Sequence, residues 1–538
     1  MSHTNADADV GMSMTTQWRT RMTSTSPRKR RLALGAAAVF ACSLALPLSA
    51  TGAAAAEPGL AGSDLFVNPF STTLEAAQSL SGQARDDAQL LGSIPSAEWF
   101  TKGTPAEVEA AARAYVDAAA AAGQMPVLVA YNLPFRDCAQ YSAGGALDTA
   151  AYTAWIDGLA AGIGDRPATV ILEPDGLGII PWYTTINGDE EWCKPAEADP
   201  ATAAAARFEQ LNHAVDALGA LAATSVYLDG THSGWLGVGD ISDRLIKAGV
   251  ERATGFFLNA SNYVETERLI KYGTWISDCI NLSVNSWWEP QWCASQYYPA
   301  NPGDFSTWAL TDAAFAQAYA DTGVTRDPAA QAHFVLDTSR NGQGPWAGPV
   351  APYPGAPAGA DPEVWCNPPD RGLGALPTTE TGNPLIDAYL WIKVPGESDG
   401  KCFRGTAGPL DPERGMEDPA AGQWFVEQAR ELIQFAQPPL APLDCNVSWN
   451  AANAGKGSLV KLHIDGAATG PWTLSFVLPT DATVTKATHA TVVQDGRKVS
   501  VTSSGSKRGN APDVVLTTKG AADQPWIFWL DGRACTSA

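Results

Sequence analysis

Two carboxylates follow directly on a short apolar run in Thr169–Leu177, which reads TVILEPDGL. The run Val170–Leu172 lacks the alternation of a half-exposed strand, so it predicts a strand buried on both faces. Pro174 has no amide hydrogen to donate, so the strand should end there and present Glu173 and Asp175 at its carboxyl end. Catalytic groups of α/β folds collect at that end. The alternative is that Asp175 only caps the next helix.

A third acidic residue, Asp137, also follows an apolar run. Val127–Tyr131 predicts another buried strand, after which the sequence reads NLPFRDC and then a small-residue loop that ends in Gly144 and Gly145. Arg136 could hold the Asp137 carboxylate ionised, or the two residues could form a structural ion pair. Two predicted strands therefore end in acidic side chains.

Together these stretches resemble the paired signatures of glycoside hydrolase family 6, the inverting cellulases. The first reads Val-x-Tyr-x-x-Pro-x-Arg-Asp-Cys with a Gly-rich tail, and the second reads an apolar run before Glu-Pro-Asp. Inverting hydrolysis needs an acid and an activated water between carboxyls roughly 6.5–9.5 Å apart. The resemblance implies that Asp175 is the proton donor, which requires a raised pKa. It implies that Asp137 raises that pKa and helps stabilise the oxocarbenium-like state.

The segment Trp391–Gly400, WIKVPGESDG, resembles a third signature of the family. It places Asp399 at the position of the proposed base, although the base could instead act through a chain of waters. Asp229 matches another acidic position, with a positioning or electrostatic role. The resemblance also implies substrate-binding residues: the stacking side chains Trp99, Trp235 and Trp365, the hydroxyl of Tyr131, and the polar contacts His232, Asn259, Arg340, Lys393 and Glu397. Any one of these tryptophans could instead belong to the core.

Predicted strands and helices alternate along most of the chain. After a first strand region near Ala97–Phe100, strands are predicted at Val127–Tyr131, Val170–Leu172, Ser225–Asp229, Thr254–Asn259, His333–Asp337 and Ala388–Lys393. Helices are predicted at Thr104–Ala122, Thr149–Ile163, Ala201–Leu221 and Gln423–Gln437. This alternation indicates βα units and a parallel sheet. The resemblance implies the family's distorted, seven-stranded parallel α/β barrel.

Two long connections bear on how a polymer would enter the site. Asn262–Gln331 contains five tryptophans (Trp275, Trp287, Trp288, Trp292 and Trp308), and Lys401–Gly422 extends the chain after Asp399. Long loops are usually functional lids, and a roofed cleft would favour processive release of cellobiose. We therefore expect a cellobiohydrolase, and the resemblance implies that it acts from non-reducing ends. An open-cleft endoglucanase and a catalytically inactive glucan-binding protein are the alternatives.

The pattern becomes all-β after the Pro-rich stretch Gln437–Pro442. Strands are predicted at Leu459–Ile464, Trp472–Leu478, Ala490–Val493, Lys498–Thr502, Val514–Thr517 and Trp526–Leu530. The resulting sandwich resembles a family 2 carbohydrate-binding module in its terminal cysteines, its Trp-Thr-Leu-x-Phe stretch and its closing strand before Asp-Gly-x-x-Cys. Thr488 stands where such modules expose a tryptophan. Cellulose binding and a purely stabilising role therefore both stay open for this domain.

The N-terminal sequence predicts export. The basic Pro27–Arg31, the apolar Leu32–Leu48 and the alanines before Glu57 are typical of a signal peptide. We expect a secreted, extracellular protein with four parts: a signal peptide at 1–56, a catalytic domain at 57–437, a linker at 438–444 and a β-sandwich at 445–538.

Net charge and amino-acid composition indicate which kinds of binding partner to expect. The net charge of −22 argues against nucleic acid, and no apolar run after the signal peptide approaches bilayer length. Nineteen tryptophans are available for sugar stacking, although most are expected in cores. The expected partner is cellulose or another β-1,4-glucan, without nucleic acid, membrane or cofactor, and the expected state is a monomer.

Eight cysteines remain once Cys42 leaves with the signal peptide, and an even number in an exported protein predicts four disulfides. A metal site is the alternative, but there is no Cys-x-x-Cys pair and there are only six histidines. The resemblance implies Cys138–Cys193 and Cys366–Cys402. Cys445 and Cys535 bracket the last segment, which leaves Cys279–Cys293.

Overall fold

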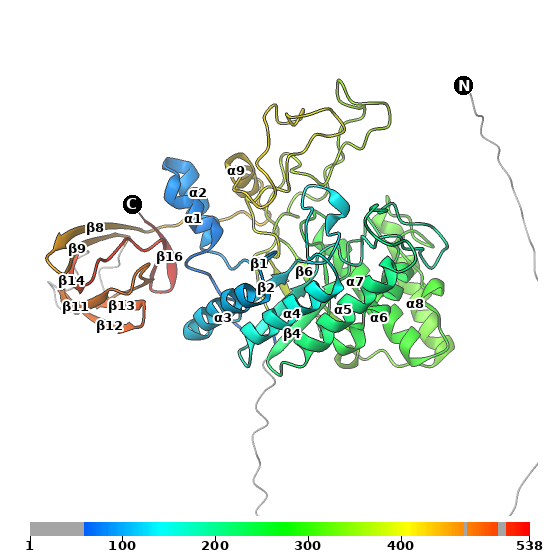
Figure 1. Cartoon of the computed structure of the whole chain (residues 1–538), viewed down its shortest axis with the longest axis horizontal. Coiled ribbons are helices and arrows are strands. Elements are labelled where there is room, and N and C mark those ends of the chain that lie inside the picture. Colours follow the sequence, from blue (N-terminus) through cyan, green and yellow to red (C-terminus); the bar gives the residue numbers. More distant parts are fainter. Residues whose placement is uncertain (1–58, 467–470, 504–512, 538) are drawn as a thin grey trace, which may run out of the picture. The chain divides into compact units, whose positions relative to one another are not determined.

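A computed structural model describes residues 59–466, 471–503 and 513–537 (Figure 1). The predicted signal peptide, residues 1–56, lies outside the described residues. Seven parallel strands form one sheet in chain order. They are β1 (Glu98–Phe100), β2 (Val127–Ala130), β3 (Ala168–Leu172), β4 (Thr224–Asp229), β5 (Gly255–Leu258), β6 (His333–Asp337) and β7 (Ile386–Leu390).

The seven-stranded sheet curls but does not close into a complete barrel. Each strand pairs with its sequence neighbours, which leaves β1 and β7 as the two edges. Two hydrogen bonds span the gap between these edges: the amide of Ala97 donates to the carbonyl of Trp391 at 3.0 Å, and the indole of Trp99 donates to the carbonyl of Ile392 at 2.8 Å. The expected distorted barrel is therefore an open one.

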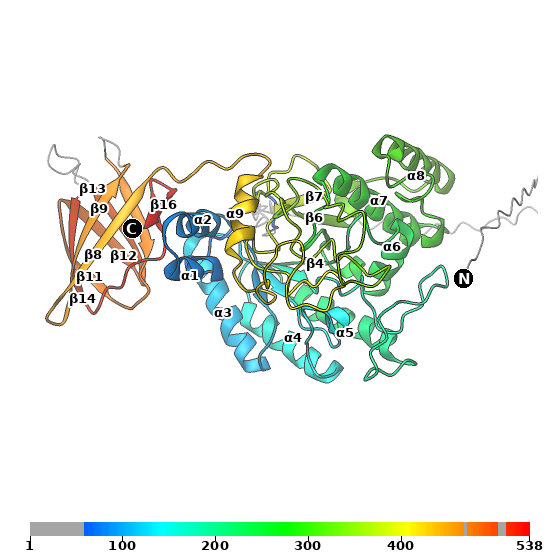
Figure 2. The ribbon, with the colours of Figure 1, turned by 90° about the horizontal axis from the view of Figure 1, so that it is seen from above.

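Helices cover the outside of the sheet (Figure 2). The helices between strands are α3 (Pro105–Ala122), α4 (Thr149–Ile163), α5 (Ala203–Gly219), α6 (Val238–Lys247), α7 (Thr266–Asn285) and α8 (Ala309–Thr322), with α1 (Thr72–Ser79) and α2 (Gly82–Gly92) before β1. Val170 and Leu172 of β3 pack in the outer cluster with the helices, whereas Ile171 packs inside the sheet. Burial on both faces explains why the strand sequence is continuously apolar.

Most of these elements begin and end within a few residues of the predicted bounds. Helix α3 begins with a capping box, in which the Thr104 hydroxyl accepts from the amide of Glu107 and the Glu107 carboxylate accepts from the amide of Thr104. The four disulfides join the pairs that the sequence suggested: Cys138–Cys193, Cys279–Cys293, Cys366–Cys402 and Cys445–Cys535.

The prediction that residues 262–331 form a lid is wrong. About half of this segment belongs to helices α7 and α8, which pack on the sheet. Trp275 and Trp308 are buried, with ring centroids 5.2 Å apart. The disulfide Cys279–Cys293 joins α7 to the next 3₁₀ turn, η3 (Pro290–Trp292). The long irregular connections are instead 338–385, between β6 and β7, and 391–425, between β7 and α9 (Val426–Gln434).

The C-terminal domain is a β-sandwich. Its strands are β8 (Asn446–Ala454), β9 (Gly457–Asp465), β10 (Thr473–Val477), β11 (Thr483–Thr488), β12 (Ala490–Asp495), β13 (Lys498–Ser503), β14 (Asp513–Lys519), β15 (Phe528–Leu530) and β16 (Arg533–Ser537). One layer has the order β11-β14-β9-β8 and the other β15-β10-β13-β12, and β16 pairs with both β8 and β15. Sequence patterns missed β8, β11 and β16.

Among the described helices of the chain, none has both the length and the apolar character that crossing a bilayer requires.

Candidate active site

The turn after β3 presents the two carboxylates of the Glu-Pro-Asp stretch in different surroundings. Both residues adopt left-handed backbone, with φ of 58° at Glu173 and 63° at Asp175. Such angles are costly for side chains with a Cβ and occur often at functional sites. Glu173 is buried, and its carboxylate accepts from the amides of Asn132 at 2.9 Å and Leu133 at 3.1 Å. Burial raises its pKa to about 7. Glu173 therefore fastens β3 to the segment after β2.

Asp175, in contrast, faces an open cavity. Its carboxyl group accepts no hydrogen bond from any residue in the described part of the chain. Burial is the first cause that raises the pKa of Asp175 well above its ordinary value, and the negative charges of Asp229, Asp137 and Asp399 add to the shift. The side chain is therefore disposed to keep its proton near neutral pH.

Asp137 lies at the start of the turn after β2. Its carboxylate accepts from the amide of Ser142 at 2.7 Å, and burial raises its pKa to about 6. Arg136 makes no ion pair with it. The guanidinium donates instead to the carbonyls of Thr101, Tyr131 and Ser142 and lies 4.5 Å over the ring of Tyr131. Arg136 thus shapes the loop, and its charge lowers the pKa of Asp137 only through space.

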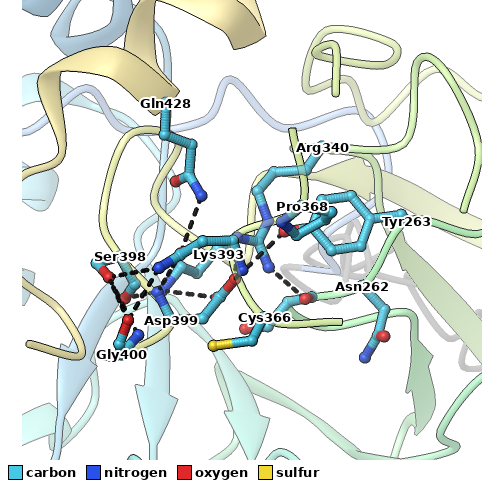
Figure 3. A network of polar contacts seen from close by, with 12 residues as sticks. Asn262, Tyr263, Arg340, Cys366, Pro368, Lys393, Ser398, Asp399, Gly400 and Gln428 are labelled. Atoms are coloured by element: carbon cyan, nitrogen blue, oxygen red, sulfur yellow. Dashed lines mark hydrogen bonds and ion pairs between the residues drawn. The ribbon is translucent and has the colours of Figure 1, made fainter. Parts of the chain in front are cut away.

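Asp399 sits in a dense polar network (Figure 3). One carboxylate oxygen accepts from the guanidinium of Arg340 at 2.9 Å, the hydroxyl of Tyr263 at 3.2 Å and the amide of Asn367 at 3.0 Å. The ammonium of Lys393 lies 3.6 Å from the other oxygen. Although burial acts in the opposite sense, the charges of Arg340 and Lys393 lower the pKa of Asp399 below its ordinary value. Asp399 is thus a firmly held anion.

Asp229, at the end of β4, is buried beneath the turn that carries Asp175. Its carboxylate accepts from the amides of Leu177 at 3.3 Å, Gly178 at 3.2 Å and Thr231 at 2.8 Å. Burial raises its pKa to about 6 despite these bonds. This arrangement orients the turn and adds negative charge near Asp175.

A cavity of about 1060 Å³ opens at the carboxyl ends of the strands. Of the residues that the sequence predicted, the following line it: Trp99, Tyr131, Asp137, Asp175, His232, Trp235, Trp365, Lys393, Glu397 and Asp399. The structure does not bring Asp229, Asn259 or Arg340 to the lining. Asn259 donates to the carbonyl of Asp337 at 2.9 Å and accepts from the amide of Val264 at 3.0 Å, so its amide is used to fix loops. Arg340 is buried behind Asp399.

Sequence reasoning missed four aromatic residues of the lining: Tyr141, Trp192, Tyr263 and Trp346. A signal existed for Trp192, because Cys193 beside it is bridged to Cys138, the neighbour of Asp137. Trp346 lies in the irregular segment 338–385, where no periodicity indicates which way a side chain points.

Tyr141 joins three loops around the cavity. Its hydroxyl donates to the carboxylate of Glu363 at 2.8 Å and accepts from the amide of Phe403 at 3.1 Å, while that amide also lies 2.9 Å from Glu363. The segment after β2 is thereby tied to both long connections, 338–385 and 391–425. The Cys366–Cys402 disulfide links the same two connections covalently.

One cluster in the described residues has the spacing of a metal site: Cys402, Asp411 and Asp418. Its chemistry does not fit a metal. Cys402 is oxidised in the bridge to Cys366, and Asp411 is paired with the buried guanidinium of Arg404 at 2.7 Å.

A family profile, curated proteins and a solved structure are similar to this chain, and they are named as glycosyl hydrolases, endoglucanases or a cellobiohydrolase. The profile of glycosyl hydrolases family 6 matches residues 60–436. Endoglucanase A of Thermobispora bispora is 30% identical over 444 residues, which cover 78% of this chain and 80% of that protein. Probable 1,4-beta-D-glucan cellobiohydrolase C of Neosartorya fischeri is 28% identical over 407 residues, or 70% of this chain and 78% of that protein. The structure of the endoglucanase Cel6 from Mycobacterium tuberculosis, in complex with a thio-cellobioside, matches with a TM-score of 0.51 and 33% identity, over 71% of this chain and 99% of that one.

Proposed function

Because this chain belongs to glycosyl hydrolase family 6, we propose that it is an inverting β-1,4-glucanase with Asp175 as its general acid. One observation carries the proposal: the Asp175 carboxyl faces the cavity without a hydrogen-bond partner in the described chain, in surroundings that raise its pKa. A carboxyl group that stays protonated, and whose proton is not already donated to a neighbouring residue, can donate that proton to a glycosidic oxygen.

The neighbouring carboxylates support the same chemistry. Asp137 and Asp229 lend negative charge, which raises the pKa of Asp175 and favours the positive charge that develops on the sugar ring. In an inverting reaction, water attacks from the face of the ring opposite the acid, and its proton must pass to a base.

The contacts of Asp399 bear on the identity of that base. A carboxylate held by Arg340, Lys393 and Tyr263, with a lowered pKa, is a weak proton acceptor. We therefore assign to Asp399 the positioning of Lys393 at the cavity. We propose that the water proton is not transferred directly to Asp399 but passes through a chain of further waters to bulk solvent at the mouth of the cavity.

The aromatic lining supports binding of a β-glucan chain. Trp99, Trp235 and Trp365 present apolar faces of the kind that stack on sugar rings. We assign polar contacts with the sugar to Lys393 and Glu397, and distortion of the sugar ring near Asp175 to the Tyr131 hydroxyl; all three residues line the cavity. In this proposal Asn259 and Arg340 position loops and do not touch the substrate.

Replacing Gly178 by alanine should weaken substrate binding. A Cβ at Gly178 would lie 2.3 Å from the ring of Trp235, so the ring must move. We expect KM for cellotetraose to rise about tenfold, which corresponds to the loss of one aromatic stacking contact of about 1.4 kcal/mol, with a smaller change in kcat. Steady-state kinetics measure this. Gly303→Ala is the matched control, since its Cβ would meet no atom closer than 3.4 Å. Unchanged KM in Gly178→Ala would argue against stacking by Trp235.

Replacing Asp137 by asparagine should change the pH profile in one direction. The negative charge of Asp137 raises the pKa of Asp175, so its removal lowers that pKa. The acid is active only when protonated, and the alkaline limb of kcat/KM should therefore move to lower pH. Asp157→Asn, at an exposed pair with His213, is the control and should not move the limb. A limb that stays in place or moves to higher pH contradicts the role of Asp137.

We further propose a cellobiohydrolase that acts from non-reducing ends. The support is that both long connections, 338–385 and 391–425, contribute residues to the cavity lining and are tied together through Tyr141 and Cys366–Cys402. The competing proposal is an endoglucanase, which is what the relatives from Thermobispora and Mycobacterium are named.

Swollen cellulose separates these two proposals. Exo action should leave most new reducing ends in solution, with cellobiose as the earliest sugar. A large insoluble share, with mixed oligosaccharides, would favour the endoglucanase. If the protein binds glucan but releases no sugar, it is instead a glucan-binding protein that kept the fold.

The rest of the chain is proposed to serve this enzyme outside the cell. Four disulfides suit an oxidising compartment, in line with the signal peptide proposed at 1–56. The proposed domains are the catalytic 57–437, the linker 438–444 and the sandwich 445–538. We assign the sandwich a stabilising role, because Trp449 and Trp472 lie in its core and Trp526 and Trp529 are partly buried.

A further inference from the structure

An exposed aromatic surface lies on the catalytic domain outside the cavity lining. It is formed by Trp287, Trp292, Tyr297 and Tyr298, whose exposed fractions are 60%, 50%, 44% and 81%. Trp288 lies between the two tryptophans and the main core: its ring centroid is 5.6 Å from Trp287 and 5.9 Å from Trp292. Solvent-facing apolar groups gathered in this way usually mark a binding surface. We call these four exposed residues the aromatic platform.

The segment that carries the platform is rigidly held. The Cys279–Cys293 disulfide fixes it to α7. The side chain of Gln296 is buried and donates to the carbonyls of Ser233 and Leu236, each at 2.9 Å. The hydroxyl of Thr311 donates to the carbonyl of Ser295 at 2.8 Å. Anchoring of this kind keeps exposed rings in place, so little conformational entropy is lost when a ligand binds.

One residue of the platform, Tyr297, adjoins the proposed active site. The hydroxyl of Tyr297 donates to the carbonyl of Trp235 at 3.0 Å, and Trp235 lines the cavity. Gln296 bonds the loop that also carries His232. A glucan chain that leaves the cavity past Trp235 would therefore pass close to Tyr297.

The chemistry of the platform suits a neutral polymer. From Cys279 to Gly303 the sequence contains one Asp, Glu, Lys or Arg, namely Glu289. Surfaces for nucleic acid or charged protein partners carry many more charges. Aromatic rings with nearby amide and hydroxyl groups instead match the apolar C–H faces and hydroxyl edges of glucose units.

We propose that the aromatic platform is a second cellulose-binding surface, which holds the insoluble substrate beside the active site. This proposal rests on the proposed action of the enzyme on β-1,4-glucan. It also gives the catalytic domain a cellulose contact of its own, in a chain whose C-terminal tryptophans are buried or partly buried.

The test compares the full-length secreted protein with Trp287→Ala/Trp292→Ala on two substrates. Adsorption to microcrystalline cellulose, measured in the cold, should fall about 10- to 100-fold, since each of the two lost stacking rings contributes up to about tenfold. Hydrolysis of that cellulose should fall with it, whereas turnover of soluble cellotetraose should equal that of the wild type. Trp287→Tyr/Trp292→Tyr should restore most of the adsorption. Leu147→Ala/Leu376→Ala, which removes exposed apolar groups elsewhere, should leave adsorption unchanged.

Three results would overturn the proposal. Adsorption could stay unchanged in Trp287→Ala/Trp292→Ala. Cellotetraose turnover could fall as far as cellulose hydrolysis, which would make these residues part of the active site. The wild type could dimerise in sedimentation experiments and the variant could be monomeric with normal adsorption, which would make the platform a contact between copies. A wild type that adsorbs through the platform but hydrolyses no β-1,4-glucan would reject the proposed function and leave this inference standing.

Discussion

Replacement of Asp175 by asparagine should lower the rate of cellulose hydrolysis by about 10²- to 10⁴-fold, the range that a general acid contributes. Asparagine keeps the size of the side chain but has no acidic proton to give. The carboxyl has no hydrogen-bond partner among the described residues, so its loss should disturb the fold little. Initial rates on swollen cellulose measure the loss, and calorimetric titration with cellotetraose should show an affinity close to that of the wild type.

A change of leaving group separates loss of the acid from general damage. A dinitrophenyl cellooligosaccharide releases a phenolate that needs no proton, so the Asp175→Asn variant should be far less impaired on this substrate than on cellulose. Equal impairment on both substrates would contradict the assignment of Asp175 as the acid. Weak binding of cellotetraose would point instead to a distorted cavity.

Replacement of Asp399 by alanine should lower the free energy of unfolding by about 3–5 kcal/mol, the usual effect of breaking a buried ion pair from one side. The change leaves Arg340 buried with its positive charge uncompensated and removes the acceptor for Tyr263 and the amide of Asn367. Lys393 loses its nearest carboxylate as well. Equilibrium unfolding in urea measures the effect.

Two further variants serve as controls for the Asp399→Ala prediction. Asp157→Ala breaks an exposed pair with His213 and should cost less than about 1 kcal/mol. Asp399→Ala/Arg340→Leu removes both members of the buried Asp399–Arg340 ion pair and should recover part of the lost stability. If Asp399→Ala unfolds like the wild type but loses all activity, Asp399 is a dedicated base and not the positioning residue that we propose.

The strands and their acidic ends could be predicted because each is encoded locally. Val170–Leu172 is buried on both faces and therefore apolar throughout, and Pro174 marks where the ladder must stop. Once parallel strands end at one edge, side chains that follow them converge. Asp137 and Asp175 therefore line one cavity although they lie far apart in the sequence.

The error over residues 262–331 has a physical cause. The tryptophans suggested a sugar-binding lid, but Trp275 lies on the buried face of α7 and contacts Trp308. Leu269, Tyr272, Ile276 and Ile280 are also buried along α7, which is the spacing of a helix packed on a core. Tryptophan type alone could not separate buried Trp275 from exposed Trp287, since both suit a core and a sugar surface.

Residues that act through contacts between loops could not be predicted from local sequence patterns. The roles of Tyr141 and Trp346 depend on irregular segments that meet only in the folded chain. The sequence resemblance likewise suggested Asn259 and Arg340 as substrate contacts. In the structure, the Asn259 side chain hydrogen-bonds to neighbouring backbone, and Arg340 pairs with Asp399.

The stereochemistry of the first product tests the central claim most directly. Proton NMR of a fresh cellotetraose digest resolves the anomers before they interconvert. We predict that the new reducing ends appear first as the α-anomer, because water attacks opposite the bond that Asp175 protonates. Initial formation of the β-anomer would mean that a side chain attacks the sugar and that the enzyme retains configuration, which contradicts the mechanism proposed for Asp175 and its neighbours.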